Sequence, residues 1–277
     1  KRFGIEMLLW LWLFAPAEKQ DTIARTYAEA TGKDWILLNT IKKALFYQCI
    51  HQEPYLVDKI YSLITGIEKT VQRINAEEIL EKYARQKRDA SQWKDYTVIP
   101  VKTPRDEVAS AAQGWRDVRG KNDREKICIA LDTMLGILLL YKNIPQAVCS
   151  FLATDMETLM IYQLQGIRYE KADVHGRFAQ GNVKRQLGKG ARGLFRLDWQ
   201  GFLVAYAEQI AEQSGFSRQG IQSGQFHEMT RKKYDDTKEV HLSLERAVEI
   251  YDGTAVRLGY MQGKDQNWYK MLGKNGI

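Results

Sequence analysis

The sequence KICIALDTMLGILLLYKNIPQAVCSFLATDMETLMIYQL spans residues 126–164, and its apolar positions predict what lies at the centre of the protein. The four residues before it, 122–125, read Asn-Asp-Arg-Glu, which is the pattern of a capping box. Pro145 suits the first turn of a second helix, which we expect to reach Leu164. The first half carries apolar side chains at the spacing of one helical face: Ile127, Leu131, Leu135, Leu138 and Leu139. We therefore predict two consecutive core helices here.

The segments before this stretch also show helical periodicity. Residues 18–30 and 35–50 are predicted to form two helices joined by a short turn. Residues 75–78 form another capping-box pattern, before a charged helix that we expect to run towards residue 90. Between them, Pro54 can open a helix whose apolar stripe predicts its buried face: Leu56, Ile60, Leu63, Ile64 and Ile67.

The segments after the central stretch are predicted to be helical as well. Asp198 can cap an amphipathic helix that Gly215 can end. A long helix is expected over about residues 229–250, with a turn at residues 252–253. Residues 96–101, YTVIPV, are the exception, because β-favouring residues and a proline indicate an extended connection or a short edge strand.

These patterns predict the fold class: mostly α, a multi-helix globular protein with at most one or two short strands. We place a domain boundary at the exceptional segment. Residues 1–95 would form an N-terminal helical domain, and residues 104–277 a C-terminal helical domain. A chain of 277 residues can also form one large domain, and that alternative stays open.

The composition favours a folded protein with anionic partners. Hydrophobic residues make up 44% of the chain, which is enough to bury a substantial core and argues against global disorder. The formal net charge of +7 favours nucleic acid, an anionic membrane surface or an acidic protein segment. The three cysteines lack the spacing of zinc ligands, and so few of them suit a reducing compartment. We therefore expect a cytoplasmic location.

Positive charge is concentrated in residues 174–197, VHGRFAQGNVKRQLGKGARGLFRL, which contain five glycines and no carboxylate. Lysine and arginine supply donors for phosphates, and glycines let a backbone approach them closely. Two alternatives stay open: an acidic protein or lipid surface as the partner, and a merely solvated loop. The spacing of the glycines excludes a P-loop. The six cations of this basic segment are Arg177, Lys184, Arg185, Lys189, Arg192 and Arg196.

Three further features bear on partners. The cluster Arg231, Lys232 and Lys233 would lie at the margin of the same polyanion site. Residues 3–17 include an apolar run with two tryptophans, which predicts a buried core helix or a helix at a membrane surface. A helix-turn-helix is also compatible with residues 20–45, although plain helix packing explains the same pattern.

The sequence shows no catalytic constellation. The four histidines are scattered, and neither an HExxH nor a GxSxG pattern occurs. We therefore predict a non-enzymatic, cofactor-free subunit of a larger protein assembly that contacts a DNA or RNA backbone through the basic segment. The alternative is a cytosolic adaptor of a membrane-associated machine, which recruits acidic protein or lipid.

Overall fold

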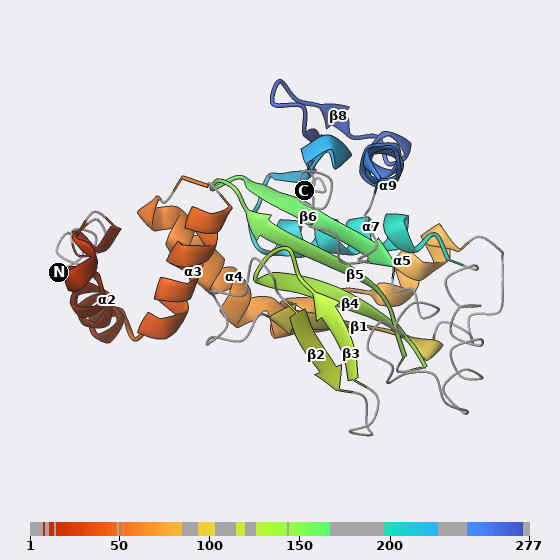
Figure 1. Ribbon diagram of the computed structural model, residues 1–277. Coiled ribbons are helices and arrows are strands. Elements are labelled where there is room, and N and C mark those ends of the chain that lie inside the picture. Colours follow the sequence, from red (N-terminus) through yellow and green to blue (C-terminus); the bar gives the residue numbers. More distant parts are fainter. Residues whose placement is uncertain are drawn as a thin grey trace, which may run out of the picture.

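The structure is a computed structural model, shown in Figure 1. It describes residues 8, 11–13, 15–48, 50–51, 53–84, 94–102, 115–119, 126–142, 144–166, 197–226 and 243–273.

A seven-stranded mixed sheet forms the centre of the protein. Every neighbouring pair in it is antiparallel except β6 and β7, which are parallel. A separate hairpin pairs β2 (Trp115–Arg119) with β3 (Lys126–Ala130). From one edge to the other, the sheet runs β1 (Tyr96–Lys102), β4 (Leu135–Tyr141), β5 (Ile144–Ala153), β6 (Thr158–Gly166), β7 (Arg218–Ile221), β9 (Trp268–Met271) and β8 (Met261–Gln262).

This sheet shows that the prediction of a mostly α, all-helical protein was wrong. The two predicted core helices are strands β3 to β6, and Pro145 lies inside β5. The physical reason is that β4 is buried on both faces. Leu135, Ile137 and Leu139 belong to the main core, whereas Leu138 and Leu140 belong to a smaller cluster on the opposite face. A strand covered on both sides is apolar at every position, so its spacing also matches a helix.

The helices outside that stretch agree better with the sequence. Pro54 opens α4, and all five residues of the predicted stripe are buried. Asn75 accepts a hydrogen bond from the backbone of Glu78, as a capping box requires. The described helices are α2 (Ala17–Thr31), α3 (Trp35–Tyr47), α4 (Pro54–Arg73), α5 (Ala76–Tyr83), α7 (Trp199–Gln213) and α9 (Leu244–Arg257), with a short 3-10 turn η4 (Gly224–Phe226).

Two boundaries in the C-terminal part also test the prediction. Asp198 caps α7 by accepting from the Gly201 N–H at 3.2 Å, and Gly215 follows the helix in a left-handed conformation, both as expected. The turn predicted at residues 252–253 was wrong, because α9 continues through both to Arg257. The predicted helix over residues 229–250 is described from residue 244 onward.

Helices α4 and α7 pack on one face of the sheet and place the main core there. In Figure 1, α2 and α3 extend beyond one end of the sheet, and α9 lies near the edge formed by β8 and β9. The 3-10 turn η4 packs directly against α9. This arrangement brings α9, which is late in the chain, beside the parallel strands β6 and β7.

The N-terminal apolar run is only partly buried in the part that the structure describes, because Leu11 is exposed. Trp12 and Leu13 are buried, and the Trp12 indole donates to Asn39 of α3 at 3.2 Å. The Lys42 ammonium donates to the Trp12 carbonyl at 3.1 Å, which supports the end of this helical turn. No helix among the described residues is long and apolar enough to cross a membrane. Contact of residues 3–17 with a membrane surface stays a prediction.

Candidate functional site

The predicted polyanion site lies outside the residues that the structure describes. This applies to the six cations of the basic segment and to the cluster that follows α7. The structure therefore does not test whether these side chains gather on one surface. The residues concerned are Arg177, Lys184, Arg185, Lys189, Arg192, Arg196, Arg231, Lys232 and Lys233.

A different candidate site lies where the parallel strands β6 and β7 part. The two strands pair from Thr158 opposite Arg218 to Ile161 opposite Ile221. There β7 ends, while β6 continues to Gly166. Ligands of open sheets bind outside the carboxyl ends of parallel strands, where the chain leaves neighbouring strands in different directions. This is the single such place among the described strands of the sheet.

A β-bulge in β6 coincides with the parting of the strands. Ile161 pairs with Phe151 of β5 and Gln163 pairs with Ser150, so Tyr162 is the extra residue. A bulge bends its strand and increases the local twist, and bulges are frequent beside active sites. Burial raises the pKa of Tyr162 further above the usual value of a phenol. The bend therefore lies at the point where β6 loses its parallel neighbour.

Tyr251 of α9 takes the place of β7 beyond the parting. The backbone N–H of Leu164, on the continuing part of β6, donates to the Tyr251 hydroxyl at 3.1 Å. Tyr251 is 2% exposed, and burial raises its pKa well above the usual value, with a further contribution from the Asp132 carboxylate. A neutral phenol thus satisfies a strand amide that would otherwise need another partner.

The next residue, Asp252, fixes α9 against the chain that leaves β7. Its carboxylate accepts from the Gly224 N–H at 2.9 Å, the Trp268 indole at 3.0 Å and the Ser223 hydroxyl at 3.2 Å. These hydrogen bonds to a charged acceptor join α9 to η4 and to β9. Gly224 also approaches α9 so closely that an added Cβ would lie 2.4 Å from the Ala247 carbonyl carbon. The walls of the site are therefore tightly joined.

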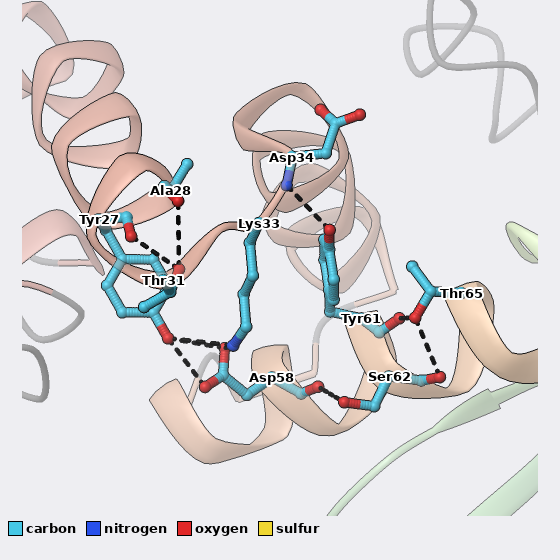
Figure 2. Close-up of polar contacts among 9 residues, drawn as sticks. All are labelled: Tyr27, Ala28, Thr31, Lys33, Asp34, Asp58, Tyr61, Ser62 and Thr65. Carbon is cyan, nitrogen blue, oxygen red and sulfur yellow. Dashed lines mark hydrogen bonds and ion pairs between the residues drawn. The ribbon is translucent and has the colours of Figure 1, made fainter.

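A second polar cluster lies among the N-terminal helices and is drawn in Figure 2. The Lys33 ammonium is 2.6 Å from the Asp58 carboxylate and 3.2 Å from the Tyr27 hydroxyl, which itself donates to Asp58 at 2.8 Å. Tyr61 of α4 accepts the Asp34 N–H at 2.8 Å. Burial, followed by hydrogen bonding to Asp58, raises the pKa of Tyr27. The cluster joins the turn between α2 and α3 to α4, and we interpret it as structural.

The described residues offer no metal centre: no group of three or more His, Cys, Asp or Glu side chains among them could hold an ion. Comparison with known proteins yields no match of any kind, because no family model, no curated protein and no solved structure matches the chain. Function is therefore inferred from the fold and from the parting of β6 and β7.

Sequence reasoning missed the residues of this site. Asp252 was interpreted as part of a turn, and Tyr162 as part of a core helix. One signal was present in TLMIYQLQG, residues 158–166, where apolar or aromatic and polar residues alternate from Tyr162 to Gln165. Alternation of period two is the pattern of a strand.

Proposed function

We propose that the chain binds an acyl-coenzyme A at the parting of β6 and β7 and transfers its acyl group to an amine. The observation that carries the proposal is the strand order. Without the β2–β3 hairpin, the strands β1, β4, β5, β6, β7, β8 and β9 can be renumbered 1 to 7 along the chain. In this numbering the sheet has the order 1-2-3-4-5-7-6, and strands 4 and 5, which are β6 and β7, are parallel. Acyl-coenzyme A N-acyltransferases share this order and this parallel pair. The likeness is an argument from topology.

The chemistry of the ligand suits the two ends of the site. The arm of coenzyme A is extended and carries two amides, so it can pair with the edge of a strand as a β-strand does. Its nucleotide end carries phosphates. The chain that leaves β6 at Gly166 leads into the basic segment, residues 174–197, which has six cations and no carboxylate. Asp198 already caps α7, so we assign the phosphates to the basic segment and not to that helix end.

The proposed reaction requires only its two substrates, the thioester and the amine, and no further cofactor. The amine nitrogen forms a bond to the thioester carbonyl carbon, the carbon–sulfur bond breaks, and the amine proton passes to the departing thiolate. This proposal differs from the non-enzymatic function expected from the sequence. The difference arises because the sequence patterns did not predict the sheet, and the enzymatic proposal depends on the strand order of that sheet.

Calorimetric titration of the full chain with coenzyme A and with acetyl-coenzyme A tests the proposal. We expect both to bind, and we expect the affinity to fall with rising salt, since phosphates meet lysine and arginine. Alanine at Lys184, Arg185 and Lys189 should weaken binding of both ligands. A mixture of acetyl-coenzyme A with small amines should then release free thiol. Absence of binding of either ligand at low salt would exclude the proposed function.

A second candidate function is binding to a nucleic-acid backbone, favoured by the charge of the basic segment. If four to six of its cations contact phosphates, log K should fall with log salt at a slope of roughly −3 to −5. A salt titration with single-stranded and duplex DNA and RNA measures this slope. The alanine variant named above should have a flatter slope, and an unchanged slope would contradict this candidate.

A further inference from the structure

We infer that Tyr27, Asp58 and Tyr61 form a binding site for a primary alkylammonium ion, and that Lys33 of the same chain occupies this site as a built-in competitor. The site is independent of the proposed function, because its walls belong to α2 and α4 and not to the sheet. Figure 2 shows the Lys33 side chain between the two tyrosine rings, with its ammonium at Asp58.

The ammonium of Lys33 has the contacts of a bound cation. It lies 5.3 Å from the centre of the Tyr27 ring and 5.6 Å from the centre of the Tyr61 ring. Both distances are within the roughly 6 Å over which an aromatic ring attracts a cation. The Asp58 carboxylate is 2.6 Å from the ammonium, and the Tyr27 hydroxyl oxygen is 3.2 Å from it. Two rings and a carboxylate therefore meet at one positive charge.

The two oxygen acceptors determine which kind of ammonium fits. The Tyr27 hydroxyl donates its own proton to Asp58 at 2.8 Å, so its oxygen still offers a lone pair to the cation. This oxygen and the Asp58 carboxylate both require N–H donors, which a primary ammonium has and a quaternary ammonium lacks. The site therefore favours a primary alkylammonium ion, such as a lysine side chain, over a fully substituted one.

The walls of the site are held together without the Lys33 side chain. The hydrogen bond from Tyr27 to Asp58 joins α2 to α4. The Tyr61 hydroxyl accepts the Asp34 N–H at 2.8 Å, which joins α4 to the start of α3, and Asp34 itself caps that helix. Removal of the Lys33 side chain therefore leaves the carboxylate and both rings in place. A site that is already arranged in this way binds a ligand without the cost of ordering its walls.

The site is also accessible from solvent. In Lys33 and Asp58, 21% and 32% of the side-chain surface is accessible. The Lys33 ammonium is carried on a flexible four-carbon stem, so rotation of this side chain can move the charge into water. An external amine must compete with this tethered one, whose effective concentration is at least in the range of about 1 mM. We therefore expect dissolved amines to fill the site far more readily when Lys33 is replaced.

NMR titration of the full chain with n-butylammonium chloride tests the inference, with the Asp34 amide signal as the local reporter because Tyr61 accepts that N–H. We expect a saturable shift in Lys33→Ala, with the same concentrations of sodium chloride as the reference. The wild type and Lys43→Ala, which is changed at an exposed position of α3, keep Lys33 in the site and should bind at least about tenfold more weakly. Lys33→Ser replaces the alanine variant if that variant does not fold.

Two further titrations identify the groups that hold the cation. Tetramethylammonium chloride should bind Lys33→Ala at least about tenfold more weakly than n-butylammonium, because it has no N–H to donate. The double variant Lys33→Ala, Asp58→Asn should lose n-butylammonium binding by a similar factor, because the carboxylate is gone. Absence of a saturable shift in both Lys33→Ala and Lys33→Ser would overturn the inference. So would equal affinity in Lys33→Ala and Lys43→Ala, or binding that Asp58→Asn leaves unchanged.

Discussion

The backbone N–H of Leu164 donates to the hydroxyl of Tyr251 at 3.1 Å, although the two residues are 87 positions apart in the chain. The hydroxyl occupies the position of a strand partner at the point where β7 has ended. A side chain from α9 thereby completes the hydrogen bonding of a strand in the sheet. This contact links the stability of the fold to the geometry of the candidate site.

Tyr251→Phe tests the contribution of this hydrogen bond to stability. The ring remains, but the buried Leu164 N–H loses its acceptor, and an unpaired buried donor costs about 1–3 kcal/mol. We expect the free energy of unfolding to fall by that amount in urea denaturation. Tyr55→Phe is the control, because Tyr55 is exposed on α4 and its change should have almost no effect. Equal stability of the wild type and Tyr251→Phe would contradict the importance of the contact.

A pair of glycine substitutions tests the close approach of η4 to α9. In Gly224→Ala, the new Cβ would lie 2.4–2.5 Å from backbone atoms of Ala247 and Val248, so the two segments must separate. We expect a loss of more than about 2 kcal/mol. Gly253→Ala, within α9, meets no atom within 4 Å and should stabilise the helix by up to about 1 kcal/mol. Thermal denaturation of both variants gives the comparison, and opposite shifts of Tm are required.

The success of sequence reasoning depended on whether a segment has one buried face. In α4, Ile60 and Ile67 are fully buried while Tyr55 is exposed, so the helical period is visible in the sequence. In β4, Leu138 and Leu139 are both fully buried, on opposite faces of the sheet. Such a strand has no polar side to reveal its period of two, and local spacing could not distinguish it from a buried helix.

The candidate site was less predictable because its residues meet only in the folded chain. Leu164, Gly224 and Tyr251 belong to three different elements, and no short motif joins them. The parting of β6 and β7 depends on strand order, which is a property of the whole sheet. The basic segment, in contrast, was visible from composition alone, and its role stays a prediction.

The ion pair between Glu68 of α4 and Lys102 of β1 predicts a dependence of stability on pH. Their charged atoms are 2.6 Å apart, and the hydrogen bond from Lys102 lowers the pKa of Glu68. A carboxyl group whose pKa is lower in the folded state contributes stability above its unfolded pKa of about 4.3, and loses it as the pH falls through the folded value. Because Glu68 is half exposed, the contribution is at most about 1 kcal/mol.

Urea denaturation of the wild type and Glu68→Gln at about pH 7 and about pH 3 measures this effect. The variant should be less stable at neutral pH, and the difference should shrink in acid, where the wild-type carboxyl group becomes protonated. Glu29→Gln on the exposed face of α2 is the control and should show no comparable change between the two pH values. A difference that grows in acid would refute the assignment.

The cluster around Lys33 predicts a local loss of structure in the N-terminal helices. In Lys33→Met, the apolar stem remains, while the Asp58 carboxylate loses a cation at 2.6 Å and the rings of Tyr27 and Tyr61 lose the charge between them. Lys33 and Asp58 are partly exposed, with 21% and 32% of their side-chain surface accessible, so we expect a modest cost of about 1 kcal/mol. Lys43→Met, exposed on α3, is the matched control. Hydrogen exchange should become faster at the turn between α2 and α3 in Lys33→Met, with β4 and β5 unchanged, because the hydrogen bonds and the ion pair of the cluster join that turn to α4. Uniformly faster exchange across β4 and β5 would show instead that the cluster supports the whole fold.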